Sequence, residues 1–431
     1  MKAASKWLLL LAAITILFCA RAQAQTVYEK DVAFALEAIE KECGTLLVAK
    51  KIDWKAVGKE FTASAKAVQS DQAHLVLLTR LLARLQDGHC QVTSTDKTKD
   101  VRWPEEPERV GCGMFWCRSG KKILVKTVWS TAAADGLEPG LEVVKVDGKP
   151  VDAWLDARIA AMRDTQSFST PQQAFYRATH QGLAMPKGTR LELELEDVGG
   201  KPKKRTITYT KGSAVPWGPA VMPDGLEGSD DVSCKLLDPN TGYVRIRRCK
   251  ENLPSEIDQA LAKVGTAKGL ILDFRANSGG GFDHDEFMGR FLPKGDTLQG
   301  GATSTSRGEH PYGGPIVVIV DAGVVSAGET GSGIFKEDGR AYVIGESATA
   351  GMSSQKTTIA LPSGLFGLFV SIASNKGRFN GGRGIEGIGV SPHEIVPYSA
   401  KDLAAGVDTL IQRARDLLNK FPQDKVPYKA H

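Results

Sequence analysis

The sequence predicts an α/β core that follows a helical N-terminal segment and an inserted, strand-rich domain. Three observations predict this fold class: helical spacing of leucines early in the chain, short β-rich stretches in its middle, and alternating strand and helix patterns from about residue 240. The 431 residues, 42% hydrophobic and 24% charged, are typical of a globular protein of two or three domains. We expect four segments: a signal peptide at 1–24, a helical region at 25–104, the inserted domain at 105–215 and the α/β core at 216–431.

The N-terminus has the pattern of a secretory signal. Lys2 and Lys6 precede an apolar run at 7–18, and Ala-Gln-Ala at 22–24 fits the small-x-small rule for cleavage. The run is too short to remain as a membrane span, and no other segment has the length and apolarity of one. We therefore expect a periplasmic or secreted protein, cleaved near Ala24, with no stable membrane span.

Charge and cysteine content exclude some classes of partner. The formal net charge is +5, and Lys2, Lys6 and Arg21 lie in the expected signal, so the mature chain gives no basis for nucleic-acid binding. Six cysteines follow the signal, an even number that permits disulfides without predicting a pairing. No Cys and His spacing matches a zinc site, and Asp-His-Asp at 283–285 is interpreted as the start of a solvated helix. No metal or cofactor is expected, and the oligomeric state stays open.

Residues 26–98 are predicted to be helical, because leucines between 75 and 85 recur at helical spacing. Gly88 follows where helices end in a left-handed conformation, and His89 comes next. Asp-Gly-His at 87–89 has two interpretations. It is a helix stop with a satisfied polar side chain, or it holds a histidine at a rigid helix end beside a cleft.

Residues 105–212 contain several predicted strands, among them 113–116, 123–129 and the alternating leucines of 191–195. This order resembles a PDZ domain of the kind found in bacterial envelope proteases, which takes a peptide C-terminus by adding it to a sheet edge. The resemblance places Gly113, Met114 and Phe115 at the peptide-binding edge, although Phe115 also fits a plain core role. Residues 152–186 exceed the pattern and are expected to form an inserted helical piece.

The α/β core begins near residue 240. Strands are predicted at 242–246, 269–275, 315–321 and 341–345, with helices at 254–264, after Ser326 and at about 402–418. Two turns in this core can carry chemistry or be purely structural. The glycines of 277–281 make a tight turn or direct an N–H group into a cleft, and no Gly-Lys-Ser/Thr follows to make a phosphate loop.

Ser326 is the most informative residue of the core. Ser-x-x-Glu, with Glu329, is the capping-box pattern, and most such matches are only caps. The same position, at the start of a helix after an apolar strand, also favours negative charge and can hold a nucleophilic hydroxyl. The local pattern leaves both interpretations open.

The motifs together resemble the C-terminal processing (tail-specific) serine peptidases, whose peptidase core is ClpP/crotonase-like. Each motif is weak singly, but the order is specific, and the resemblance covers nearly all of the mature chain. The matching segments besides the PDZ-like domain are 85–89, 269–280, 326–329, 339–346 and 386–392.

The resemblance departs from the branch that uses a serine–lysine dyad. With Gly345, Glu346 and Gln355 setting the register, Gly351 stands where that lysine would be; a one-residue slip puts Met352 there. Lys356 lies nearby on a different face of the pattern. The chain is more similar to the branch of the tricorn core protease and the interphotoreceptor retinoid-binding protein.

That branch implies roles for residues of this chain. Ser326 becomes the nucleophile, His89 the base and Glu386 the supporting carboxylate, with Gly279 and Ala327 N–H groups as the oxyanion hole. Gly88 stands where the tricorn pattern has a serine, so that member is missing or supplied elsewhere.

The expected function is that of an exported serine-type peptidase acting on polypeptide substrates, possibly recognised by their C-termini. The alternative is a non-catalytic member that binds a peptide or hydrophobic ligand, since a fold can carry ligands without catalysis. Hydrolysis of a non-peptide ester or amide by the same site is a third reading.

Overall fold

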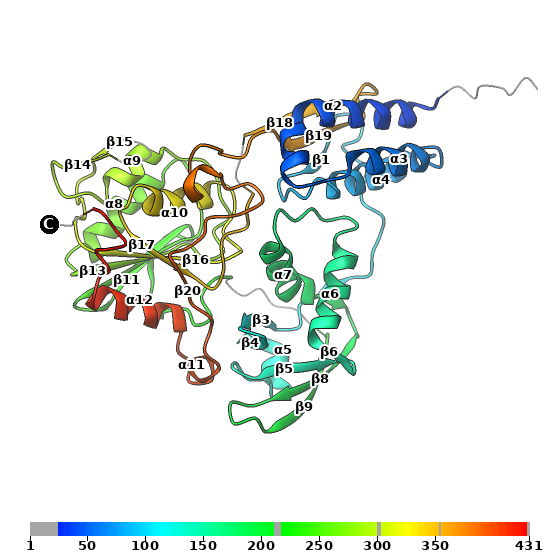
Figure 1. Ribbon diagram of the computed structural model, residues 1–431. Helices are drawn as coiled ribbons and strands as arrows, with labels where there is room; N and C mark the ends of the chain where they lie inside the picture. Colours follow the sequence, from blue (N-terminus) through cyan, green and yellow to red (C-terminus); the bar gives the residue numbers. More distant parts are fainter. Residues whose placement is uncertain (1–24, 211–216, 300–302, 353–354, 429–431) are drawn as a thin grey trace, which may run out of the picture.

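The structure is a computed structural model that describes residues 25–210, 217–299, 303–352 and 355–428. It has three parts: an N-terminal helical layer, an inserted α/β domain and an α/β core (Figure 1). The expected signal peptide at 1–24 lies outside the described residues. Within the described ranges, no helix is both long and apolar enough to cross a bilayer.

The core is built on a seven-stranded sheet with the order β10-β11-β12-β13-β16-β17-β20. The strands from β12 onward run parallel, and β11 is antiparallel to its neighbours. Their bounds are Glu227–Gly228, Val232–Asp238, Thr241–Ile246, Gly269–Asp273, Ile316–Val320, Tyr342–Gly345 and Glu394–Ile395. The strands predicted from the apolar runs are present, so the alternation of strand and helix is confirmed.

Helices cover both faces of this sheet. Helices α8 (Leu253–Val264), α9 (His284–Gly289) and α10 (Ala327–Glu337) lie on one face, and α12 (Thr409–Asn419) lies on the other (Figure 1). In β16, Val318 and Val320 pack on the α8–α10 side, whereas alternate residues pack on the α12 side. A strand buried on both faces needs an unbroken apolar run, which is what the sequence has there.

The predicted last helix at 402–418 is wrong as a single element. The structure has α11 (Ala400–Ala404) and α12, separated by Gly406 at φ +70°. Asp408 caps α12 by accepting from the N–H groups of its first turn, and it also pairs with Arg275 at 2.9 Å. A buried ion pair that a residue-by-residue pattern cannot show therefore sets this helix start.

The N-terminal layer contains α2 (Val27–Ala49), α3 (Trp54–Ala65) and α4 (Asp71–Ala83). The all-helical prediction for 26–98 is wrong at its end, where β1 (Gln91–Ser94) pairs antiparallel with β19 (Phe366–Ser371). Strand β19 pairs in turn with β18 (Lys356–Ala360), so a hairpin from the second half of the chain completes this layer (Figure 1). Residues of the hairpin pack on the leucines of α4, which closes the apolar cluster.

The inserted domain is an antiparallel sheet of order β3-β4-β5-β8-β9, with helices packed beside it. The longer strands are β3 (Met114–Ser119), β4 (Lys122–Val128), β5 (Glu142–Val146), β8 (Arg190–Glu196) and β9 (Pro202–Thr208). The short elements are β2 (Arg109–Val110), α5 (Ser130–Ala134), β6 (Lys149–Pro150) and β7 (Met185–Pro186). The predicted helical piece is present as α6 (Val151–Met162) and α7 (Pro171–Thr179), which lie between the domain's sheet and the N-terminal layer (Figure 1).

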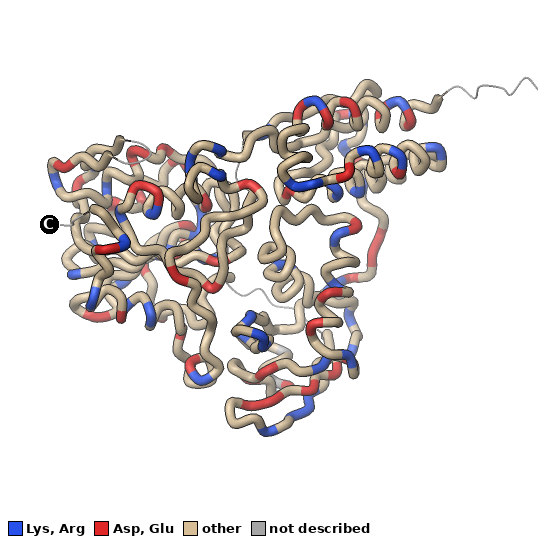
Figure 2. Tube along the Cα trace, in the orientation of Figure 1, with Lys and Arg blue, Asp and Glu red and all other residues tan. Residues whose placement is uncertain are grey.

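Charged residues of both signs are interspersed over all three parts (Figure 2). The six cysteines of the described residues are free thiols, and all but Cys90 are buried. The five buried cysteines therefore act as small apolar side chains in the packed interior.

Candidate active site

Ser326 occupies a strained turn between β16 and α10. Its backbone has φ +55° and ψ −125°, a conformation that costs a non-glycine residue about 1–3 kcal/mol and needs support from its surroundings. The turn is held on both sides: Asp321 Oδ1 accepts from the N–H groups of Gly323 and Ala276, and Val325 N–H donates to Asn277 O. The sequence therefore places one serine in a fixed position where a buried strand ends and a helix begins.

Glu329 supplies the remaining support. This fully buried carboxylate accepts from Ser326 N–H at 3.1 Å, which confirms the predicted capping partner. It also accepts from Thr349 Oγ1 and from the N–H groups of Gly351 and Met352, at 2.6 to 2.8 Å. Burial raises the pKa of Glu329 to about 7, against the lowering effect of these donors. One carboxylate thus connects the Ser326 turn to the loop before β18.

Lys356 lies beside the nucleophile candidate. Its Nζ is 3.5 Å from Ser326 Oγ, and burial lowers the pKa of this half-buried ammonium. The sequence pattern put Lys356 on a different face, but the start of β18 brings it back to the turn. Gly351, at φ +81°, leaves no room for the expected lysine, because a Cβ there would lie 2.5 Å from Thr170 Cγ2.

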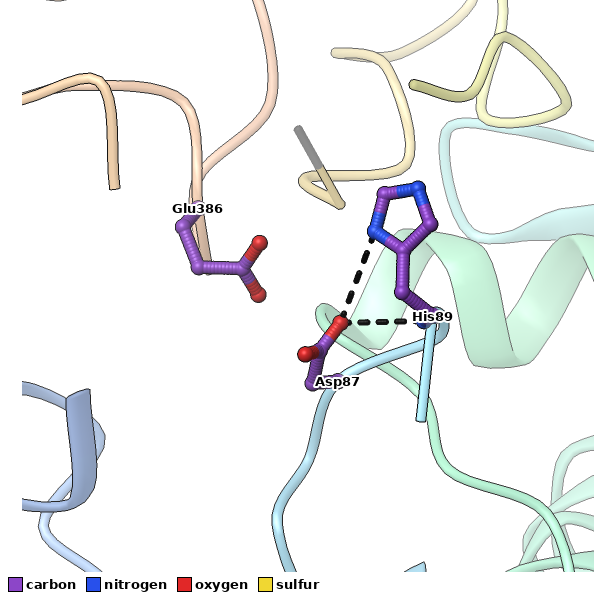
Figure 3. A group of neighbouring side chains, drawn as sticks. All are labelled: Asp87, His89 and Glu386. Atoms are coloured by element: carbon purple, nitrogen blue, oxygen red, sulfur yellow. Dashed lines mark hydrogen bonds and ion pairs between the residues drawn. The ribbon is translucent and has the colours of Figure 1, made fainter. Parts of the chain in front are cut away.

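His89 lies in the turn after α4, beside Asp87. The backbone N–H of His89 donates to Asp87 Oδ1 at 2.9 Å, and the ring Nδ1 of His89 lies 3.7 Å from the same oxygen (Figure 3). Among the described residues, neither imidazole nitrogen has a hydrogen-bond partner. Burial lowers the pKa of His89 to about 4. The Asp87 charge opposes this shift, and the charges of Lys356 and Lys50 lower the pKa further. The imidazole is therefore neutral at pH 7, which is the form that accepts a proton.

Glu386 faces the Asp87–His89 pair from the core (Figure 3). Its Oε1 accepts from Lys50 Nζ at 2.7 Å and from Ser169 Oγ at 3.3 Å. Burial and the Asp87 charge raise the pKa of Glu386 to about 8, while Lys50 opposes them. In contrast, the pKa of Asp87 is held below its usual value because Lys50 and hydrogen bonds outweigh its burial. The pKa values of the two carboxyl groups are therefore shifted in opposite directions.

Asp87, His89 and Glu386 offer ligand atoms within 4.8 Å of one another, which is close enough to hold a metal ion. The set does not fit one well, because the Lys50 ammonium already pairs with Glu386 at 2.7 Å. A cation would have to displace this buried ion pair. The arrangement fits proton transfer and orientation better than metal binding.

The two oxyanion candidates lie beside Ser326. Gly279 has φ +76°, and a Cβ there would lie 2.8 Å from Ser326 Cβ, so only glycine allows this approach. Its N–H, however, donates to Asn277 Oδ1 at 2.8 Å. Ala327 is the first residue of α10, where helix N–H groups have no partner within the helix. The predicted positions are thus brought together, but the Gly279 N–H must leave or share Asn277 to bind an oxyanion.

Of the predicted peptide-binding residues, Met114 and Phe115 begin β3, the edge strand of the inserted domain, and Gly113 directly precedes it. Met114 and Phe115 are buried, and the Phe115 ring packs on His180, Trp129 and Trp217. A cavity of about 590 Å³ lies next to this strand. It is bounded by β3, α6, α7 and the core residues Ala322, Glu346 and Ser347. The cavity therefore reaches from the inserted domain to the turn that precedes Ser326.

Sequence reasoning missed three residues of this site, Lys50, Asp87 and Ser169, and it placed Lys356 on a different face of the pattern. Asp87 has a visible signal, since it lies two residues before His89, but the local pattern indicates only a helix stop. Lys50 and Ser169 come from distant parts of the chain, and nothing local indicates their contact with Glu386.

An α/β core with a strained serine at a helix start, a neutral histidine and buried carboxyl groups beside it is the arrangement of a serine-type hydrolase. Residues 240–396 match the sequence profile of peptidase family S41. The chain is 28% identical over 355 residues to a carboxyl-terminal-processing protease of Synechocystis sp., covering 79% of this chain and 73% of that protein. It is 29% identical over 359 residues to one of Picosynechococcus sp., covering 79% and 78%.

Its fold is similar to that of mature CPAF in complex with lactacystin, with a TM-score of 0.62 and 13% identity over 93% of this chain and 99% of that one. These findings support a serine-type hydrolase whose residues 240–396 are similar to peptidase family S41.

Proposed function

We propose that the protein is an exported serine peptidase that cleaves polypeptide substrates, with Ser326 as nucleophile and His89 as base. One arrangement carries the proposal. Ser326 is held in a strained turn at a helix start, and Lys356 contacts the Ser326 hydroxyl. The His89 imidazole, which has no hydrogen-bond partner among the described residues, lies near the same lysine. The similarity to carboxyl-terminal-processing proteases supports the substrate class.

The chemistry follows from the groups present. His89 Nδ1 lies on the Asp87 side, so Nε2 is the nitrogen available to take the Ser326 proton as Oγ attacks the scissile carbonyl. His89 then gives this proton to the leaving amine, and a water that His89 deprotonates releases the acyl group. The ionised Asp87 stabilises the imidazolium, and Glu386, proposed as the supporting carboxylate, adds to this in its ionised form. The N–H groups of Gly279 and Ala327 stabilise the oxyanion.

We further propose that the 105–215 segment is PDZ-like and takes the substrate C-terminus beside β3. Strand β3 is at the edge of its sheet, and the 590 Å³ cavity lies between it and α7, so a peptide added to β3 would point toward the Ser326 turn. Export through the 1–24 signal gives such a peptidase periplasmic or secreted substrates. Gly351 in place of the dyad lysine favours the tricorn-like branch.

A fluorophosphonate probe tests the nucleophile. We expect covalent labelling of the mature protein that is lost in Ser326→Ala, with an unchanged circular dichroism spectrum. No Ser326-dependent labelling of folded protein would overturn the proposal. For the substrate class, one peptide is compared with a free and an amidated C-terminus. Faster cleavage of the free acid supports C-terminal recognition, and equal rates contradict it.

The second candidate is a non-catalytic member that binds a peptide or hydrophobic ligand. It is favoured by the engagement of the Gly279 N–H with Asn277, which leaves the oxyanion site unassembled. Turnover of casein or a tailed peptide that disappears in both Ser326→Ala and His89→Ala excludes it. Saturable binding without turnover supports it.

A further inference from the structure

The segment 167–173, which leads into α7 and forms its first turn, contacts three loops of the candidate active site. Ser167 Oγ accepts from Asp87 N–H at 2.7 Å, and Ser169 Oγ accepts from Gly88 N–H at 3.0 Å. Thr170 Oγ1 donates to Ala350 O at 2.8 Å, and Gln172 Nε2 donates to Thr349 O and Ile388 O. This segment of the inserted domain thus joins the His89 turn, the loop bound to Glu329 and the segment of Glu386.

Ser169 differs from the other polar residues of the segment. The contacts of Ser167, Thr170 and Gln172 with these three loops go to backbone groups, whereas Ser169 Oγ also lies 3.3 Å from Glu386 Oε1. A hydroxyl has one proton to donate, so while Oγ accepts from Gly88 N–H it can give that proton to the carboxylate. Ser169 is buried, and its own N–H donates to Gln173 Oε1, which fixes its position.

Gly88, the residue before His89, explains why the hydroxyl beside Glu386 comes from Ser169, a residue distant in the sequence. A Cβ on Gly88 would lie 2.7 Å from Gln173 Nε2 and 2.8 Å from Met352 Sδ. No side chain fits at position 88 without moving both neighbours. The turn that bears His89 therefore cannot supply its own polar group toward Glu386, and the space is filled by the inserted segment.

We propose that Ser169 is a positioning residue of the S41 active site, which fixes the His89 turn through Gly88 and favours the ionised form of Glu386. This inference rests on the proposed function for its catalytic consequence only. The bridge from the Gly88 N–H to the Glu386 carboxylate is a claim about the folded protein, and it can be tested without turnover.

The charges around Glu386 come from four elements. Lys50 lies at the end of α2, Asp87 and His89 lie after α4, Glu329 is on α10 and Lys356 begins β18. None of them is changed by substituting Ser169. A donor to a carboxylate favours its ionised form, so loss of the hydroxyl shifts the Glu386 titration to higher pH.

The experiment uses the full mature chain with ¹³C-labelled glutamate side chains, in which the Glu386 signal is assigned by Glu386→Gln. In Ser169→Ala, we expect the Glu386 titration to move up by roughly half a pH unit or more. The matched control is Ser167→Ala, which loses a bond to the adjacent backbone N–H but no contact with Glu386. We expect its Glu386 titration to be that of the wild type.

Kinetics provide the second readout. We expect Ser169→Ala to lower kcat about three- to tenfold at pH 7 with KM nearly unchanged. The pH–rate limb should shift together with the Glu386 titration. Ser169→Thr, which keeps the hydroxyl, should retain the wild-type rate. An unshifted titration in Ser169→Ala, or an equal shift in Ser167→Ala, overturns the proposal. If the wild type shows no Ser326-dependent turnover, the peptidase function fails, while the titration still decides the role of Ser169.

Discussion

The two halves of the active site are held in different ways. The Ser326 turn is fixed by the α/β core itself, through Asp321, Asn277 and Glu329. The His89 turn belongs to the N-terminal layer, and its contacts come both from that layer, through Lys50 at the end of α2 and Ser371 of β19, and from Ser169 of the inserted domain. The position of the proposed nucleophile is thus fixed locally, whereas that of the proposed base depends on how the parts pack.

This difference implies different sensitivities. A change in the core near Ser326 acts directly on the hydroxyl proposed as the nucleophile. A change in the N-terminal layer or the inserted domain moves the histidine or its carboxyl neighbours while the serine stays in place. Substitutions on the two sides should therefore separate in labelling and turnover, because a fluorophosphonate needs the activated serine and peptide cleavage also needs proton delivery to the leaving group.

The largest effect is expected for His89. We predict that His89→Ala lowers kcat/KM by about 10²–10⁴, the usual contribution of a positioned base, and that Lys356→Ala lowers it by only about tenfold, because the ammonium supports charge without taking the proton. Steady-state cleavage of a tailed peptide measures both, with exposed His310→Ala as the control. A larger loss in Lys356→Ala than in His89→Ala would assign the base to Lys356.

The same contrast between local and distant contacts determines which features could be predicted from the sequence. The apolar run of β16 and the Ser-x-x-Glu pattern at 326–329 are local, so the strand, the turn and the Glu329 contact with the Ser326 N–H could be predicted. Lys356 could not be placed, because its position depends on β18 pairing within the N-terminal layer. The roles of Ser326, His89 and Glu386 stay predictions, and the structure adds that Asp87 is the carboxylate in contact with His89.

The second prediction concerns Glu329 on the nucleophile side. The two carboxylate oxygens of Glu329 accept from four donors. In Glu329→Gln an NH₂ group replaces one oxygen, so at least one of these buried donors faces another donor. We expect a loss of about 1–3 kcal/mol in the free energy of unfolding, the cost of a buried unsatisfied donor, together with slower fluorophosphonate labelling. Urea unfolding measures the first effect. Unchanged stability would show that the loop at 349–352 rearranges freely around the amide.

The third prediction concerns Lys50 on the base side. Its ammonium donates to Gln86 O and Glu386 Oε1, both at 2.7 Å, and so joins α2, the His89 turn and the core. We expect Lys50→Met to reduce peptide cleavage about tenfold while Ser326 labelling falls less, since the nucleophile turn is untouched. The exposed neighbour Lys51→Met is the matched control. Equal loss of labelling and cleavage would show that the two sides are not independent.

The smallest effect is a pH dependence of stability. The pKa of Glu386 is about 8 in the folded protein, above the ordinary value of 4.5, because burial disfavours its charged form. The folded state then holds this proton more tightly than the unfolded chain. The resulting stability is complete below about pH 4.5 and is lost as pH rises through 8. The pKa of Asp87 is lowered, so its contribution acts in the opposite direction, is present above 3.8 and is lost only in more acidic solution.

We therefore expect the wild-type Tm to fall between pH 5 and 8, and Glu386→Gln to flatten this slope, because glutamine cannot ionise. Some slope remains in the variant, since the pKa of Glu329, about 7, gives a contribution of the same sign on the nucleophile side. Thermal unfolding of the two proteins across this range measures the difference. If Glu386→Gln keeps the full wild-type slope, the buried carboxyl group on the base side is already ionised at pH 5, and Glu329 alone accounts for the loss of stability.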